Sequence, residues 1–106
     1  MRIDWKTVMA EAERLAGRIL EKGIDLNEAE KALKFFVQHG YDEDRLLRYL
    51  GVRASDPSFS RSRRTPGYFR GLREIWSGWK TDLPPRWKGI AWGWAIRIAK
   101  YRKEGM

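Results

Sequence analysis

The residues of this sequence with the clearest chemical potential are arginines. Residues 52–73 hold six arginines and no lysine: Arg53, Arg61, Arg63, Arg64, Arg70 and Arg73. A guanidinium group is planar and permanently charged, and it can donate two parallel hydrogen bonds to one phosphate. Thr65 followed by Pro66 is the pattern of a helix start, and the first turn of a helix leaves backbone N–H groups free for an anion. The segment is therefore predicted to bind phosphate groups, with Thr65 at the helix end that faces them.

A second basic strip follows in the last part of the sequence, with Lys88, Arg97 and Lys100 as candidate phosphate ligands. Aromatic rings lie between these cations, and rings can stack on exposed bases. Trp76, Trp79, Trp87 and Trp94 fall on helical stripes, which predicts that they are core residues. Trp92 lies off that stripe with Ile96. We expect Trp92 and Tyr68 to stack on bases or to face a partner, and Ile96 to belong to the same partner surface.

The charge of the chain is unevenly divided. The net charge is +8, but residues 1–50 hold nine basic and ten acidic residues, while residues 51–106 hold thirteen and four. A segregated charge of this kind creates a field that attracts polyanions. The sequence therefore predicts that the second half binds nucleic acid, a single strand of DNA or RNA, by its phosphate backbone.

Catalytic and metal chemistry find little support in the residue types. The single histidine, His39, is placed to cap the end of a helix through its carbonyl groups. Asp42, Glu43 and Asp44 suit the first turn of a helix, where negative charge is stabilised. No glycine-rich phosphate loop and no nucleophile–base spacing occurs. We expect a protein that is not an enzyme and that needs no cofactor and no metal.

The composition also bears on the cellular location. The chain has no cysteine, which is typical of intracellular proteins and agrees with a heat-adapted source. The first residues do not resemble a signal peptide. The longest apolar stretch, residues 90–96, is far shorter than the roughly 20 residues of a membrane-spanning helix. These features predict a cytoplasmic protein.

Apolar residues recur at helical spacing in five segments, and no β-type alternation is present. Helices are expected at about residues 5–22, 26–39, 42–50, 65–79 and 86–103, with a basic serine-rich loop at residues 52–64. The last helix has apolar residues on two sides, which favours a central position or contact with another molecule. The predicted fold is all-α, a compact bundle of about five helices in a single domain of residues 1–106, whose 1–50 half is neutral and whose 51–106 half is basic.

One part of this pattern resembles a known family. Residues 27–76 contain NEAEKALKFFVQHGYDEDRLLRYLG, a basic stretch, and RTPGYFRGLREIW. They resemble the small helical domain that follows the catalytic core of plasmid and viral primase-polymerases. The matching positions are Gly40, Asp42, Leu46, Leu47, Leu50, Arg64, Thr65, Tyr68, Leu72 and Trp76. The resemblance implies a helical accessory module that helps a replication enzyme engage its template.

Two alternatives remain open at this point. The segments YFRGLREIW and WKGIAWGWAIRIAKYR also resemble the paired basic helices of the small subunits of CRISPR effector complexes, which implies binding to a guide or target strand. The other alternative is an adaptor within a larger protein complex, or self-association, through Trp92, Ile96 and Ala99 on the last helix. Peripheral attachment to a membrane by that helix is the least favoured interpretation.

Overall fold

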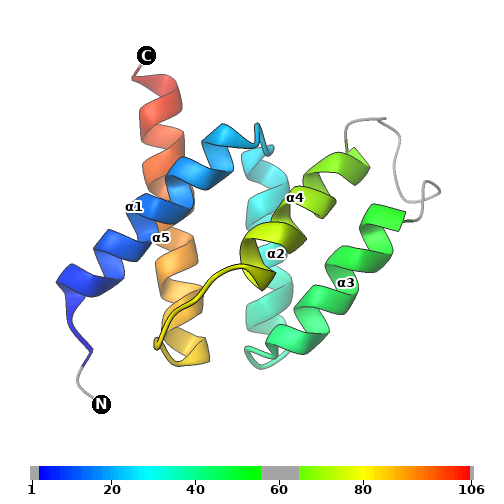
Figure 1. Ribbon diagram of the computed structural model, residues 1–106, viewed down its shortest axis with the longest axis horizontal. Coiled ribbons are helices and arrows are strands. Elements are labelled where there is room, and N and C mark those ends of the chain that lie inside the picture. Colours follow the sequence, from blue (N-terminus) through cyan, green and yellow to red (C-terminus); the bar gives the residue numbers. More distant parts are fainter. Residues whose placement is uncertain (1–2, 56–64, 106) are drawn as a thin grey trace.

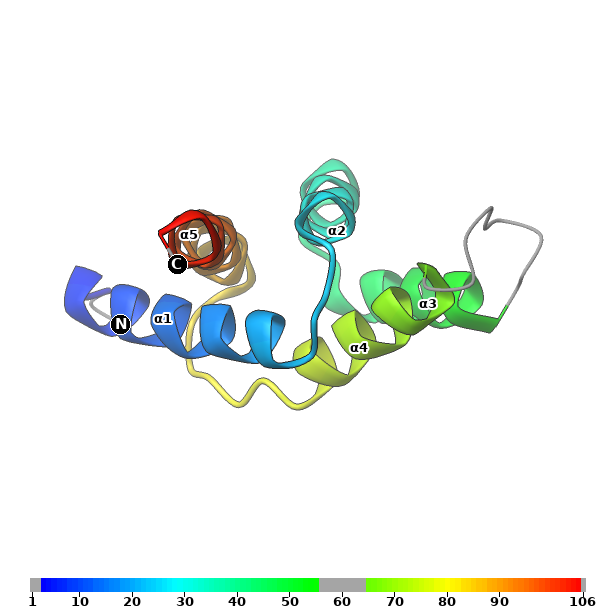
Figure 2. The ribbon, with the colours of Figure 1, turned by 90° about the horizontal axis from the view of Figure 1, so that it is seen from above.

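The structure is a computed structural model that describes residues 3–55 and 65–105 of the chain. The described residues form five helices and no strand: α1 (Trp5–Glu21), α2 (Leu26–Gln38), α3 (Glu43–Ser55), α4 (Thr65–Ser77) and α5 (Pro85–Glu104). This confirms the all-α prediction. In Figures 1 and 2, α1, α4 and the segment between α4 and α5 lie along one side of the molecule, and α2 and α5 lie along the other.

Aspartates begin the first three helices, as their positions in the sequence predict. The Asp4 carboxylate accepts a hydrogen bond from the Lys6 amide at 3.0 Å, and the Asp25 carboxylate accepts one from the Asn27 amide at 2.8 Å. The Asp42 carboxylate accepts one from the Arg45 amide at 3.1 Å. Each bond satisfies a backbone donor that has no partner within its own helix.

Two glycines end the first helices in the left-handed conformation. Gly23 has a φ of 64° and Gly40 a φ of 70°, a region in which a side chain is strained. His39 lies one residue before Gly40, and its Nδ1 is 2.8 Å from the Phe35 carbonyl oxygen. The predicted role of His39 as a helix cap is therefore confirmed.

One helix boundary differs from the prediction. Residues 52–55 were expected to begin the loop, but α3 continues to Ser55. No residue in this stretch breaks a helix until Asp56 and Pro57, and a proline disfavours helical geometry in the residue before it. The added turn packs beside α4, where the Arg53 guanidinium lies 4.9 Å from the centre of the Phe69 ring. Packing between α3 and α4 therefore extends the helix beyond the apolar pattern.

The core lies where the two sides of the molecule meet. Its largest fully buried side chains are Trp76, Trp92, Phe36, Phe69, Ile19, Leu46, Leu50, Leu72, Ile75 and Val8. Trp76 is central, with ring centroids 4.9 Å from Phe36, 5.2 Å from Trp79 and 5.0 Å from Trp92. Aromatic pairs at these distances stabilise a core beyond the burial of their area. The prediction that Trp76 and Trp79 are core residues is confirmed.

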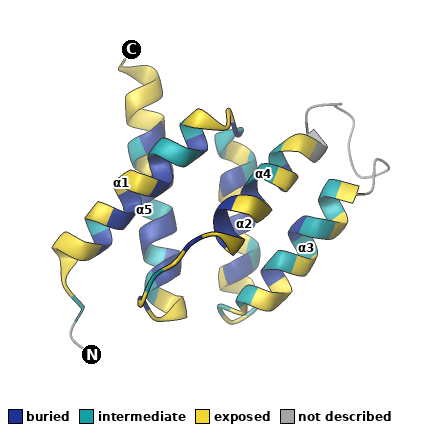
Figure 3. Ribbon diagram, viewed as in Figure 1, coloured by how far each residue is buried: buried dark blue, intermediate teal, exposed yellow. Residues whose placement is uncertain are grey.

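The side of α5 that is buried is not the side that was predicted to be buried. The buried face of α5 consists of Lys88, Gly89, Ala91, Trp92, Ala95, Ile96 and Ala99. Trp87 and Trp94, expected in the core, are only half-buried, and Tyr101 is 78% exposed. This face packs against α1 and α2, and the position of a Cβ on Gly89 lies in van der Waals contact, 3.6 Å from Phe36 of α2. Figure 3 shows the last turns of α5 as exposed.

Candidate nucleic-acid interface

The fold brings cations of α1 and α4 together on one side of the molecule. We call this surface the α1–α4 basic face, and it consists of Arg14, Arg18, Lys22, Arg70, Arg73 and Lys80. Two of these residues, Arg70 and Arg73, were predicted as phosphate ligands. The other four come from α1 and from the segment that follows α4, and no argument from the sequence had singled them out.

The α1 cations form a row because they are four residues apart. Arg14, Arg18 and Lys22 succeed one another at successive helical turns, so they share the edge of α1 beside its buried stripe. Arg14 and Arg18 line a hollow of about 120 Å³ together with Gly78 and Lys80. The row thus faces the end of α4 and the residues that follow it.

Lys22 joins the two helices at the centre of this face. Its Nζ lies 2.8 Å from a carboxylate oxygen of Glu74 on α4. The stem of Lys22 crosses α4 at Gly71, where a Cβ would lie 3.8 Å from Lys22 Cδ and 3.1 Å from Ile24 Cδ1. Glycine at position 71 therefore permits the close approach that places the α1 and α4 cations side by side.

A shallow groove of about 230 Å³ lies between α3 and α4 at the other edge of the face. Arg70, Arg73 and Ser77 line it from α4, and Gly51, Ala54 and Ser55 line it from α3. Arg73 Nε donates a hydrogen bond to the Leu47 carbonyl oxygen at 3.3 Å. This bond orients the guanidinium group in advance, so less conformational entropy is lost when it binds an anion.

The electrostatic environment of Glu74 reports the positive potential of this face. The hydrogen bond from Lys22 and the charge of Lys22 lower the pKa of the Glu74 carboxyl, and the nearby charges of Arg70 and Arg18 lower it further. Burial raises the pKa, and this effect is larger than that of either arginine. Three cations from two helices therefore act on a single exposed carboxylate, which favours its negative form.

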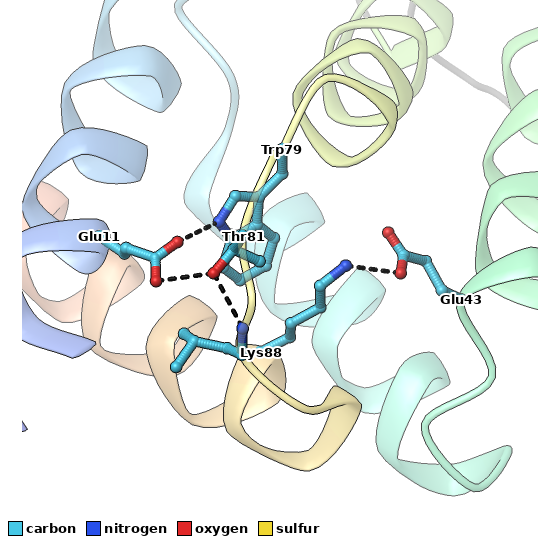
Figure 4. Close-up of polar contacts among 6 residues, drawn as sticks. Glu11, Glu43, Trp79, Thr81 and Lys88 are labelled. Carbon is cyan, nitrogen blue, oxygen red and sulfur yellow. Dashed lines mark hydrogen bonds and ion pairs between the residues drawn. The ribbon is translucent and has the colours of Figure 1, made fainter. Parts of the chain in front are cut away.

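The segment that connects α4 to α5 is fixed to α1 by a buried carboxylate (Figure 4). Glu11 accepts a hydrogen bond from Trp79 Nε1 at 2.9 Å and another from the Thr81 hydroxyl at 2.7 Å. The Thr81 oxygen in turn accepts a bond from the Leu83 amide at 3.1 Å. Both oxygens of Glu11 are thus satisfied, as burial of a carboxylate requires, and Lys80 is held next to Arg14.

Lys88 does not belong to a basic surface, contrary to the prediction. Its side chain is buried, and its Nζ lies 2.6 Å from a carboxylate oxygen of Glu43 and 5.4 Å from the centre of the Trp79 ring (Figure 4). The acidic first turn of α3 therefore draws the lysine inward. An ion pair that links α5 to α3 replaces the predicted phosphate contact.

This correction can be tested with Lys88→Met, which keeps the length of the side chain but removes its charge. We expect the free energy of unfolding to fall by about 1–3 kcal/mol, because the partly buried Glu43 carboxylate loses its cation. Affinity for nucleic acid should stay within about twofold of the unmodified chain. Lys100→Met removes the same charge from an exposed position of α5. A larger loss of affinity in Lys88→Met than in Lys100→Met would contradict the structural role.

Trp92 and Ile96 are also placed differently from the prediction. Trp92 is 0% exposed, its Nε1 donates a hydrogen bond to the Ala29 carbonyl oxygen at 3.1 Å, and Ile96 is buried beside it. These residues, with the fully buried Ala99, form the contact surface of α5 inside the molecule. The prediction that they stack on bases or face a partner is therefore wrong.

The remaining predicted residues are spread over several places. Arg61, Arg63 and Arg64 lie outside the described residues, and Thr65 begins α4. Tyr68 is half-buried. The Arg53 guanidinium lies 4.9 Å from the centre of the Phe69 ring, so it packs against the core edge. Arg97 and Lys100 are exposed on α5, and the Arg97 guanidinium lies 5.0 Å from the Trp94 ring centre.

Within the described part of the chain, no group of three or more histidine, cysteine, aspartate or glutamate residues could hold a metal ion. Asp42 caps α3 and Glu43 pairs with Lys88. These two contacts account for most of the acidic cluster at the start of α3. None of the described helices combines the length and apolar character needed to span a membrane.

The α1 part of the basic face had a signal in the sequence. Arg14, Arg18 and Lys22 have the spacing of one helical edge, but the ten acidic residues of residues 1–50 cancel them in the net charge of that half. The charge of each helical edge is therefore more informative than the charge of each half. Comparison with known proteins adds nothing to this geometry: no family model, curated protein or solved structure matches the chain.

Proposed function

We propose that this protein binds the phosphate backbone of nucleic acid through the α1–α4 basic face and has no catalytic activity. The observation that carries the proposal is the Lys22–Glu74 ion pair of 2.8 Å, which joins the end of α1 to α4 and brings the cations of the two helices to one surface. Arg14, Arg73 and Lys80 extend the same surface on either side. Clustered cations of this kind bind polyanions and release their counterions.

The form of the ligand is inferred from where the exposed rings lie. Large apolar side chains that are strongly exposed in the described residues are Trp5, Val37, Val52 and Tyr101, and none of them lines the hollows of the basic face. Binding of single strands depends strongly on bases that stack on aromatic rings. Contacts to a backbone need no such rings. We therefore propose that a paired strand binds at least as tightly as a single strand.

The process served is proposed from the resemblances. The similarity of residues 27–76 to the helical domain of primase-polymerases suggests a replication accessory that holds a single-stranded template. The alternative, a small subunit of a CRISPR effector complex, would hold a guide paired with its target. The scarcity of exposed rings on the basic face favours the paired ligand and so supports this alternative. The third alternative, an adaptor that uses Trp92 and Ile96, loses its surface because both residues are buried.

Fluorescence anisotropy with labelled oligonucleotides of about 20 nucleotides tests the function. A single strand, a DNA duplex and an RNA–DNA hybrid of the same sequence are compared between about 50 and 200 mM salt. Six phosphate contacts would give a slope of log affinity against log salt of about −5 for a duplex. The two paired ligands should bind at least as tightly as the single strand. Absence of binding at low salt, or binding that does not respond to salt, would refute the proposal.

A further inference from the structure

Glu74 is an acidic residue at the centre of a basic surface. It lies on α4, one turn after Arg70 and beside Lys22, the residue that caps the end of α1. Its side chain is 57% exposed, so it is not needed to fill the core. An exposed ion pair of this kind is weak and is screened by salt. The position of Glu74 therefore calls for an explanation in terms of the surface rather than of the fold.

Lys22 pairs directly with the Glu74 carboxylate, and the charges of Arg18 and Arg70 add to the positive potential there. Lys22 Nζ lies 2.8 Å from Glu74 Oε2, and both Arg70 and Arg18 act on the same carboxylate. Gly78 leaves room for Arg18 at the end of α4, where a Cβ would lie 3.7 Å from Arg18 Nη1. Carboxylate and phosphate oxygens accept the same charge-assisted hydrogen bonds from lysine and arginine.

We propose that the Glu74 carboxylate occupies a phosphate-binding subsite of the α1–α4 basic face, which a backbone phosphate of nucleic acid takes over when it binds. This inference rests on the proposed function and adds a location to it. In the free protein, Glu74 reduces the repulsion between Lys22, Arg18 and Arg70. In the complex, the phosphate replaces the carboxylate as the partner of Lys22, and the side chain of Glu74 turns toward solvent.

The test is Glu74→Gln, which removes the charge and keeps the size and helix preference of the side chain. Glu30→Gln is the matched control, because Glu30 is exposed on α2, on the opposite side of the molecule (Figure 2). Both variants raise the net charge by one. We expect Glu74→Gln to bind a duplex about three- to tenfold more tightly at low salt and to steepen the salt slope by about one contact. Glu30→Gln should change affinity by less than about twofold.

The outcomes separate this inference from the function on which it rests. Equal tightening by both variants would overturn the subsite, since the effect would then be one of net charge alone. Unchanged or weaker binding by Glu74→Gln, with salt-dependent binding by the unmodified chain, would also overturn the subsite but leave the proposed function in place. If neither the unmodified chain nor Glu74→Gln binds at low salt, the proposed function itself fails. Circular dichroism of both variants verifies that the helices are retained.

Discussion

Replacing Arg18 and Arg70 together by glutamate is expected to weaken nucleic-acid binding by a factor of roughly a hundred or more at about 50 mM salt. The double variant removes two cations that act on Glu74, one from α1 and one from α4. It also places two further negative charges beside that carboxylate. A phosphate approaching this surface would then meet repulsion where it now meets attraction. Fluorescence anisotropy with a labelled duplex measures the change directly.

A second charge-reversal variant provides the control. Lys31→Glu with Lys34→Glu changes two exposed lysines of α2, on the side of the molecule opposite α1 and α4 (Figure 2). Each double variant lowers the net charge of +8 by four, to +4. If the position of a charge determines its effect on binding, the control should lose much less affinity, because charges far from the ligand are screened in salt. Equal losses in the two variants would show that the chain responds to total charge and that the α1–α4 basic face is not the binding surface.

The largest expected effect on stability is that of Trp92→Ala. The substitution empties the centre of the core, where Trp92 is fully buried against Trp76, and it removes the donor to the Ala29 carbonyl. Truncation of a buried tryptophan costs about 3–5 kcal/mol. The total stability of a domain of this size is about 5–15 kcal/mol, so the variant should lie close to the limit of folding. Urea unfolding followed by circular dichroism gives the difference.

Two further variants show whether burial of Trp92 causes the loss of stability. Trp92→Phe keeps most of the volume and loses the hydrogen bond, so a smaller loss is expected than for Trp92→Ala. Trp87→Ala removes a half-buried ring that meets Trp5 edge-on at 5.4 Å, and it should also cost less. If Trp92→Ala is fully folded and its free energy of unfolding is unchanged, Trp92 cannot be a buried core residue. It would then again be a candidate for contact with a partner.

The bounds of the helices could be predicted from the sequence only in part. Helix starts and ends follow from local interactions, such as the aspartate caps and the glycines with positive φ, so the bounds of α1 and α2 were predictable. The end of α3 was not, because residues 52–55 are held in the helix by packing against α4. Local patterns do not contain that tertiary contact.

The orientation of α5 was the least predictable feature of the fold. Its apolar residues surround most of the helix, so the pattern alone allows more than one buried face. The small residues Gly89, Ala91, Ala95 and Ala99 decide it, since only that side lets α1 and α2 approach closely. The stripe that contains Trp87 and Trp94 was predicted to be the buried face because its rings are large, and this prediction was wrong. Close packing selects the side on which small residues leave room for Trp92.

The candidate site was predictable only in its α4 part. Arg70 and Arg73 were found because they are close in sequence to other arginines. Lys88 was misassigned because its partner, Glu43, is 45 residues away. The row of Arg14, Arg18 and Lys22 forms part of a basic surface only because it lies beside α4, which begins more than 40 residues later. A surface assembled from distant segments cannot be recognised from the charge of one segment.

The pairing of α1 with α5 has a consequence for the synthesis of the chain. α1 packs against α5, so α1 leaves the ribosome before residues 85–104, which cover its apolar stripe, have been made. Until then, Arg14, Arg18 and Lys22 have no fixed position relative to α4. Domains generally fold as units once their residues are available. The basic face is therefore formed only after α5 has been made, and a nascent chain that stops before α5 would have the cations without the assembled surface.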